Sequence, residues 1–372
     1  MKKIALMIIF SFLAFGFSAY TFADGTQQIN TSNANASNSN IATQQLKQKI
    51  LNFMNNIKGL NNGKSGQVTV QTITSKSFHN PEGIAISSNG NIWVVNYGNG
   101  TVTELNNKYQ FISSYNVGGN PENIAIDISG DVWVVKGNGY IAELSPQGVW
   151  LNGYDTGAFS DDIAISPGGL IYVTSTLNNS VALLEMTSQG QLVSSYTIGD
   201  VLGGPHNVAI DAIGNVWVTK ENPSVVLNLN ISTNVFTAHP AGSNPWGVAI
   251  APNGNVFVVD NGVWPSPGRS VTEFNPEGVI FGIFPTGKYP KQIAIDTDGD
   301  IWVTNQGADS VTELNPQGIV LGSYHVGKSP YGIAIAHNGD VIVSNKKDNT
   351  LSIIKGAEKT PEYFPYSGPQ WP

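Results

Sequence analysis

Residues 290–305 have the sequence PKQIAIDTDGDIWVTN, in which two short apolar segments flank a turn at Asp298-Gly299-Asp300. Ile293-Ala294-Ile295 precedes the turn, and Ile301-Trp302-Val303 follows it. Such β-branched segments on either side of a Gly turn predict two antiparallel strands joined as a hairpin. The arrangement recurs along the chain, so this unit decides the fold.

The unit occurs seven times, with starts 39 to 45 residues apart. Each copy has an opening residue, an apolar-Ala-Ile triplet, a Gly turn, and a second strand centred twelve residues after the opening. The opening residues are Pro81, Pro121, Ser160, Pro205, Pro245, Pro290 and Pro330, and the centres are Trp93, Trp133, Tyr172, Trp217, Phe257, Trp302 and Ile342. Two more strands follow in most copies, as in residues 101–105 and 111–117.

Four strands in a period near 40 residues are typical of a β-propeller blade. We therefore predict an all-β, seven-bladed propeller of four-stranded antiparallel blades. The small Ala suits a crowded inner strand, and the large residue fills the wider gap between neighbouring blades. The seventh copy lacks a fourth strand, whereas the strand-like residues 68–73 have no partners before the first copy. We expect this N-terminal strand to close the ring and cover an exposed edge; an open solenoid is the alternative.

The composition excludes several classes of protein. The chain has 372 residues, 41 Gly, 20 Pro and no Cys, so disulfide frameworks and cysteine metal sites are excluded. A net charge of −8 makes a nucleic-acid partner unlikely, because phosphate binding needs clustered Lys and Arg.

The N-terminal residues 1–23 predict a signal peptide. Lys2 and Lys3 precede an apolar run, and Thr21-Phe22-Ala23 suits the cleavage site. The mature product would be periplasmic, secreted or on the cell surface, with no transmembrane anchor; an uncleaved anchor helix is the alternative. Residues 24–44 predict a disordered Asn/Ser/Gln-rich linker, and residues 45–66 a short amphipathic helix and connector that packs on the propeller or binds a partner. The propeller spans 67–355, and 356–372 form an extended tail rich in Pro and aromatic residues.

Two copies are longer than the others, and both extra segments belong to one face of the ring. Residues 261–268, which include Trp264, lengthen a connection between a second and a third strand. Residues 199–204 lengthen a connection that enters an inner strand. Loops on a rigid scaffold commonly carry function, although surface loops also tolerate neutral insertions.

Two sets of residues at fixed repeat positions are expected to surround the channel mouth on that face. The position after the opening residue is occupied by Glu82, Glu122, Asp161, His206, Trp246, Lys291 and Tyr331. The position three after each centre is occupied by Asn96, Lys136, Ser175, Lys220, Asp260, Asn305 and Asn345. We expect ligand contacts from Trp246, Trp264, Tyr331 and His206, contacts with anionic groups from Lys136, Lys220 and Lys291, and polar contacts from Asn96, Asn305 and Asn345. A solvated rim with no ligand is the alternative.

Candidate chemistry is limited. His206 and Asp260 are the catalytic candidates, and a separation within about 5 Å would allow them to share a metal ion. The carboxylates of Glu82, Glu122 and Asp161 come from consecutive blades, so they either hold a Ca²⁺ or Mg²⁺ ion or are solvated. Glu104, Glu143, Glu273 and Glu313 share one position of the third strand, which indicates a structural role, such as bonding the next blade.

Residues 67–355 resemble known bacterial propeller repeats. Ile171-Tyr172-Val173-Thr174-Ser175 and Trp302-Val303-Thr304-Asn305 look like the YVTN repeat, and the same blades resemble NHL repeats and those of virginiamycin B lyases. The lyase resemblance implies streptogramin cleavage with a histidine and Mg²⁺. Pro205-His206-Asn207-Val208 matches the Pro-His phrase of that family. The ends of the second strands depart from its acidic pattern, since only Asp260 is acidic.

The sequence therefore predicts an exported propeller that acts as a ligand-binding or protein-interaction module, with an envelope protein, a peptide or a glycan as the partner. The alternative is a metal-assisted virginiamycin B lyase-like C–O lyase, or a hydrolase, on the same face.

Overall fold

The computed structural model describes residues 68–356, apart from residues 158, 178–179, 201–203 and 264–265. The predicted signal peptide, linker, helix and tail, together with Trp264, lie outside the described residues. Every regular element in the described part is a β-strand. None of the described residues forms a helix with the length and hydrophobicity that a membrane span requires.

The strands form seven four-stranded antiparallel sheets, as predicted. The first three blades comprise β2 (Pro81–Ile86), β3 (Ile92–Asn96), β4 (Thr101–Leu105) and β5 (Phe111–Asn116); β6 (Pro121–Ile126), β7 (Val132–Lys136), β8 (Tyr140–Leu144) and β9 (Trp150–Asp155); and β10 (Phe159–Ile165), β11 (Ile171–Leu177), β12 (Ser180–Met186) and β13 (Leu192–Asp200).

The next three blades comprise β14 (Pro205–Ile210), β15 (Val216–Lys220), β16 (Val225–Asn230) and β17 (Val235–Pro240); β18 (Pro245–Ile250), β19 (Val256–Val263), β20 (Ser266–Phe274) and β21 (Ile280–Pro285); and β22 (Pro290–Ile295), β23 (Ile301–Asn305), β24 (Ser310–Leu314) and β25 (Val320–His325). The seventh has β26 (Pro330–Ile335), β27 (Val341–Asn345), β28 (Thr350–Lys355) and β1 (Thr69–Thr74).

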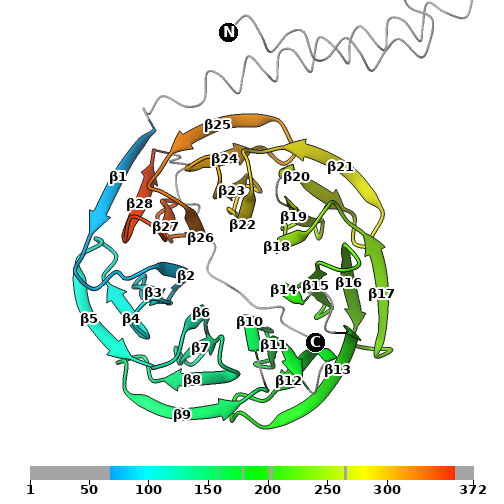
Figure 1. The fold of residues 1–372 in the computed structure, drawn as a ribbon, viewed down its shortest axis with the longest axis horizontal. Helices are drawn as coiled ribbons and strands as arrows, with labels where there is room; N and C mark the ends of the chain where they lie inside the picture. Colours follow the sequence, from blue (N-terminus) through cyan, green and yellow to red (C-terminus); the bar gives the residue numbers. More distant parts are fainter. Residues whose placement is uncertain (1–67, 158, 178–179, 201–203, 264–265, 357–372) are drawn as a thin grey trace, which may run out of the picture. The chain divides into compact units, whose positions relative to one another are not determined.

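The first strand of each repeat lies innermost, and these inner strands are arranged around the axis of the ring (Figure 1). Each inner strand contacts the inner strands of both neighbouring blades, including β2 with β26, so the ring is continuous. In the seventh blade β1 is the outermost strand. It pairs antiparallel with β28 from Thr69↔Lys355 to Thr74↔Thr350.

The core lies between adjacent blades, and the repeat explains its shape. Ala85 of β2 pairs with Trp93 of β3, and both pack against the apolar face of the second blade, including Ile124 and Val134. The small side chain therefore stands where the blades converge, and the indole stands where they diverge. Four such indoles are almost fully buried: Trp93, Trp133, Trp217 and Trp302. Truncating a core Trp costs about 3–5 kcal/mol, so these residues are major contributors to stability.

The recurrent third-strand glutamates have a structural role, and their bonds lie within their own blades in the contacts that follow. Glu104 accepts a hydrogen bond from Tyr115 Oη at 2.7 Å, and both residues belong to the same blade. The ring of Tyr115 stacks on Trp93, with centroids 5.4 Å apart. Glu143 and Glu313 bond the corresponding tyrosines of their own blades. Glu273 instead accepts from Asn255 Nδ2 of its own blade at 2.6 Å. Glu185, a further third-strand glutamate, bonds Tyr196. These bonds stabilise single blades, whereas the sequence analysis suggested a bond to the next blade.

The longer connection after Phe257 is mostly strand. Gly262 pairs with Pro267, and Val263 pairs with Ser266, so β19 and β20 continue beyond the length of the other hairpins. Likewise β13 extends to Asp200, which pairs with Ser180. Antiparallel order places these extensions on the face where the inner strands begin, as the sequence predicted.

Candidate functional site at the channel mouth

A β-bulge near the start of each inner strand shapes the site. The pairing register shifts between Pro205 and Val208 in β14 and between Pro245 and Val248 in β18, and the other five inner strands have comparable shifts. A bulge re-aims side chains out of the regular alternation of a strand. The second residue of each repeat lies within this irregular segment, which the sequence did not reveal.

The residues that follow the opening residue of each repeat are called here the second-position set. Six of these seven residues line one cavity of about 330 Å³, named here the channel-mouth cavity. Its lining is Glu122, Asn123, Asp161, His206, Asn207, Trp246, Lys291, Gln292, Gln306, Tyr331 and Lys346. A second hollow of about 530 Å³ shares Gln306 and Lys346 with it. The structure therefore brings together the residues that the sequence placed at the position after the opening residue.

The seventh member of this set, Glu82, is fully buried and forms an ion pair with Lys346. Burial raises the pKa of Glu82, and Lys346 opposes that rise. Burial, reinforced by the charges of Glu82 and Asp161, raises the pKa of Glu122 to about 8. Glu82 and Asp161 therefore lie close enough to Glu122 for their charges to raise its pKa, as expected from the sequence. With a pKa of about 8, Glu122 is largely protonated at neutral pH.

Lys291 lines the same cavity and lies against aromatic rings. Its Nζ lies 2.9 Å from the ring centroid of Trp246 and 4.7 Å from that of Tyr331. Lys346 Nζ lies 5.2 Å from the same Tyr331 ring. Burial lowers the pKa of Lys291 to about 7, although the nearby carboxylates favour its charged form. Burial likewise raises the pKa of Tyr331.

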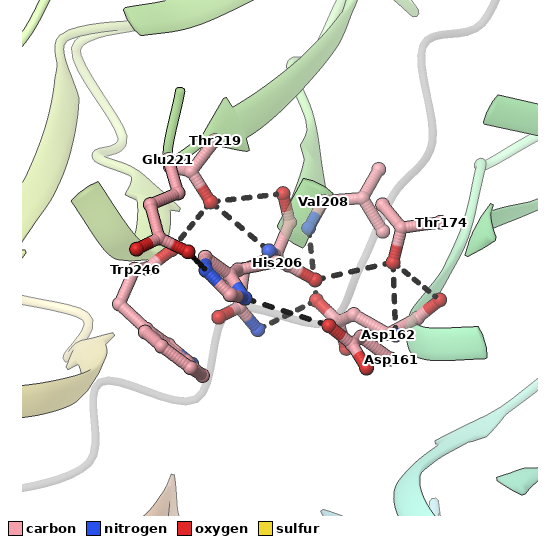
Figure 2. A network of polar contacts seen from close by, with 9 residues as sticks. Asp161, Asp162, Thr174, His206, Val208, Thr219, Glu221 and Trp246 are labelled. Atoms are coloured by element: carbon pink, nitrogen blue, oxygen red, sulfur yellow. Dashed lines mark hydrogen bonds and ion pairs between the residues drawn. The ribbon is translucent and has the colours of Figure 1, made fainter. Parts of the chain in front are cut away.

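His206 lies between two carboxylates (Figure 2). Its Nδ1 is 3.4 Å from Asp161 Oδ2, and its Nε2 is 3.6 Å from Glu221 Oε2. The imidazole stacks on Trp246, with centroids 3.5 Å apart and planes 15° apart. Each ring nitrogen therefore faces a carboxylate across a distance slightly longer than a typical hydrogen bond. Glu221 was missed by the sequence analysis because it follows β15 and belongs to neither repeat-position set.

Hydroxyl groups of the second strands connect the blades beneath this cavity (Figure 2). Thr174 Oγ1 accepts from Asp162 N at 3.0 Å and donates to His206 O of the next blade at 3.1 Å. Thr219, Thr304 and Ser344 make the same two contacts in their blades. These interblade bonds hold the backbone of the residues that line the cavity, namely His206, Trp246, Tyr331 and Glu82.

Asp162 strengthens one such junction. Its carboxylate accepts from Asn207 Nδ2 at 2.7 Å and from Val208 N at 2.8 Å, and also from Asn123. Burial raises the pKa of Asp162 to about 6, while these donors lower it. The carboxylate therefore joins three successive blades beneath the cavity.

The second predicted set does not surround the channel mouth, so that expectation about its placement is wrong. Asn96, Asn305 and Asn345 are fully buried and donate to hydroxyls of the third strand, as Asn305 Nδ2 does to Thr312 Oγ1 at 2.9 Å. Lys136 Nζ donates to Val117 O at 3.1 Å, and Lys220 Nζ donates to Asn222 O. These side chains bond nearby turns and the connections that enter the inner strands. None of them lines the channel-mouth cavity.

Asp260 belongs to this second set, and its carboxylate bonds hydroxyl groups of its own blade rather than His206. Its Oδ2 accepts from Ser270 at 2.8 Å and from Thr272 at 2.9 Å. His206 instead has Asp161 and Glu221 as its carboxylate neighbours. The predicted pairing of His206 with Asp260 is therefore replaced by a different pair of carboxylates.

The donor set does not fit the Mg²⁺ or Ca²⁺ ion that the acidic residues suggested. Glu82 already forms an ion pair with Lys346. The positive charges of Lys291 and Lys346 also oppose the rise that burial causes in the pKa values of Glu82 and Glu122, as a bound cation would. A divalent cation needs several uncommitted oxygen ligands. Among the described residues, no three His, Asp or Glu side chains are grouped to hold a metal ion.

Comparisons with known proteins agree with the fold. The model of the virginiamycin B lyase family matches residues 66–354. A structure of streptogramin B lyase aligns with a TM-score of 0.69 at 17% identity, covering 77% of this chain and 97% of that one. Virginiamycin B lyase from Staphylococcus aureus aligns with a TM-score of 0.67 at 17% identity, covering 78% and 99%. No curated protein matches the chain.

A third solved structure contains a ligand. It is a catalytically inactive histidine-to-alanine variant of the S. aureus lyase with quinupristin, and it aligns with a TM-score of 0.69 at 18% identity, covering 78% of this chain and 99% of that one. The TM-scores show that the solved structures share the fold of this chain, although the sequences are only 17–18% identical.

Proposed function

This chain belongs to the virginiamycin B lyase family, and we propose that it binds a peptide-like small ligand in the channel-mouth cavity. One observation carries the proposal: the bulged inner strands deliver two aromatic side chains, an amine, an imidazole and carboxylates to a single hollow of about 330 Å³. Pockets that combine aromatic walls with a few convergent polar groups are typical ligand sites. Of the predicted partners, a peptide segment suits this volume better than a folded envelope protein or a long glycan.

The aromatic contacts of the proposed ligand come from Trp246 and Tyr331, and the polar contacts come from His206 and Lys291. The adjoining hollow of about 530 Å³ offers room for a longer ligand to continue past Gln306. We further propose that binding takes place outside the cytoplasm, after removal of residues 1–23.

Isothermal titration of the full chain with quinupristin, a cyclic peptide, tests the binding proposal. We expect binding, and we expect Trp246→Ala to raise the Kd at least about ten-fold, which corresponds to ~1.4 kcal/mol. Trp150→Ala is the matched control, because this indole is 48% exposed on the outer strand β9. Absence of binding, or equal effects of the two variants, would contradict the proposal.

A second candidate is lyase activity, which the position of His206 between Asp161 and Glu221 favours. In such an elimination a base removes a proton from carbon, a C=C bond forms, and the ester C–O bond breaks with release of a carboxylate. His206 is the proposed base. No step is assigned to a metal ion, because the donor set does not fit one.

Chromatography with mass spectrometry of quinupristin after incubation tests this candidate. Elimination within a ring gives a ring-opened product of unchanged mass, whereas hydrolysis adds the mass of one water. We expect His206→Ala to abolish the ring-opened product and His325→Ala, on the outer strand β25, to leave it unchanged. Intact quinupristin with the wild-type chain would leave ligand binding as the function.

A further inference from the structure

Lys291 differs from an ordinary surface lysine in both position and partners. It is the second residue of β22 and is only 7% exposed, yet it lines the channel-mouth cavity. Within the described residues, its Nζ has aromatic rings as its partners, and no hydrogen bond or ion pair is formed by it. A lysine amine buried against aromatic rings loses most of its hydration, which favours the neutral form.

A second cation reinforces this effect. Lys346 and Lys291 both lie over the ring of Tyr331, at 5.2 and 4.7 Å from its centroid. The carboxylates act in the opposite direction, because Glu82, which pairs with Lys346, and Asp161 favour the charged form of Lys291. Burial and a neighbouring cation are the two arrangements that convert a lysine into a nucleophile. Both are present here. Burial is the larger of the two effects, and it lowers the pKa of Lys291 to about 7 in spite of the neighbouring carboxylates.

We propose that Lys291 is a reactive amine that condenses with a small aldehyde or ketone entering the channel-mouth cavity. This inference rests on the proposed function, because it takes the same cavity as the ligand site and adds a carbonyl group to the chemistry of its ligand. Nothing in the second-position set other than Lys291 supplies an amine.

The chemistry balances with the groups present. The Lys291 amine adds to the carbonyl carbon, and a proton moves from nitrogen to oxygen to give a carbinolamine. That oxygen then leaves as water with one additional proton, and the C=N bond forms as a protonated imine. Glu122 shares the cavity and is largely protonated at neutral pH, so it is the proton donor for this departure. No oxidant or reductant takes part in the condensation.

Reductive trapping tests the inference. The full chain is incubated with benzaldehyde and cyanoborohydride at pH 7, and peptide mapping by mass spectrometry then measures the benzyl group on each lysine. We expect Lys291 to be modified at least ten-fold faster than Lys347, an exposed lysine beside the same face. A lysine with a pKa near 7 has about a thousand-fold more neutral amine at pH 7 than an ordinary lysine. Equal rates for the two lysines would overturn the inference.

Two variants and one condition complete the test. Lys346→Met removes the neighbouring cation and leaves Glu82 unpaired, and both changes favour the charged form of Lys291, so its modification should slow several-fold. Denaturing urea should abolish the difference between Lys291 and Lys347. If either expectation fails, the folded environment is not the cause of the reactivity. Slow Lys291 modification combined with a ten-fold effect of Trp246→Ala on quinupristin would reject this inference and leave the proposed function standing.

Discussion

Replacement of Thr174 by Val tests whether the interblade hydroxyl bonds stabilise the ring. The variant keeps nearly the same shape but leaves Asp162 N and His206 O without their partner, and Thr174 is fully buried. Each buried group left unpaired costs about 1–3 kcal/mol, and the additional buried methyl returns about 1 kcal/mol. We therefore expect the free energy of unfolding to fall by about 1–5 kcal/mol. For a domain of this size, the Tm should fall by about 2–8 °C.

Thermal unfolding followed by circular dichroism measures this loss, and Thr174→Ser is the control. Serine keeps both hydrogen bonds and loses one buried methyl, so it should cost only about 1 kcal/mol. If the Val variant is as stable as the Ser variant, the hydroxyl bonds do not stabilise the junction. In that case the bond from Thr174 to His206 O would not hold the backbone of His206 beneath the cavity either.

Three further predictions concern a turn, a carboxylate and a side chain of the second set. Gly148→Ala should destabilise the fold by at least ~2 kcal/mol more than Gly169→Ala. Both glycines have a positive φ, of +73° and +82°, but an added Cβ meets Tyr115 at 2.0 Å only at Gly148. Equal losses of Tm would contradict this. Burial and neighbouring carboxylates raise the pKa of Glu122 in the folded state from 4.5 to about 8. Its contribution to stability is therefore present below pH 4.5 and is lost as the pH rises through 8. Glu122→Gln should flatten this decline of Tm with pH, and an unchanged profile would refute the expectation. Asn305→Ala should cost about 1–3 kcal/mol of stability and leave the Kd for quinupristin unchanged, whereas weaker binding in a fully folded variant would return this residue to the ligand site.

The second-position set shows how far repeat analysis reaches toward a site. Equivalent residues of a closed ring must lie at equivalent places, so an alignment of the repeats is enough to group Trp246, Lys291 and Tyr331. The same logic failed for Asn96 and Asn305. Their positions are also equivalent, but the side chains turn toward the third strand and the entering connection. A repeat defines where a backbone position lies, and local hydrogen bonding decides where its side chain points.

The sequence by itself determined the number of blades, the four strands in each, and the packing of small against large residues between them. These features depend on local β-propensity, turns and a periodic apolar pattern, which are written in every copy. Only the tertiary structure decided the chemistry of the channel mouth. The pairing of Glu82 with Lys346, the stacking of Lys291 on Trp246, and the approach of Asp161 to His206 join residues from different blades. Glu221 belongs to the blade of His206 but lies outside the repeat positions, and it approaches the other ring nitrogen. Such contacts depend on bulge geometry and on burial, neither of which is a property of any single repeat.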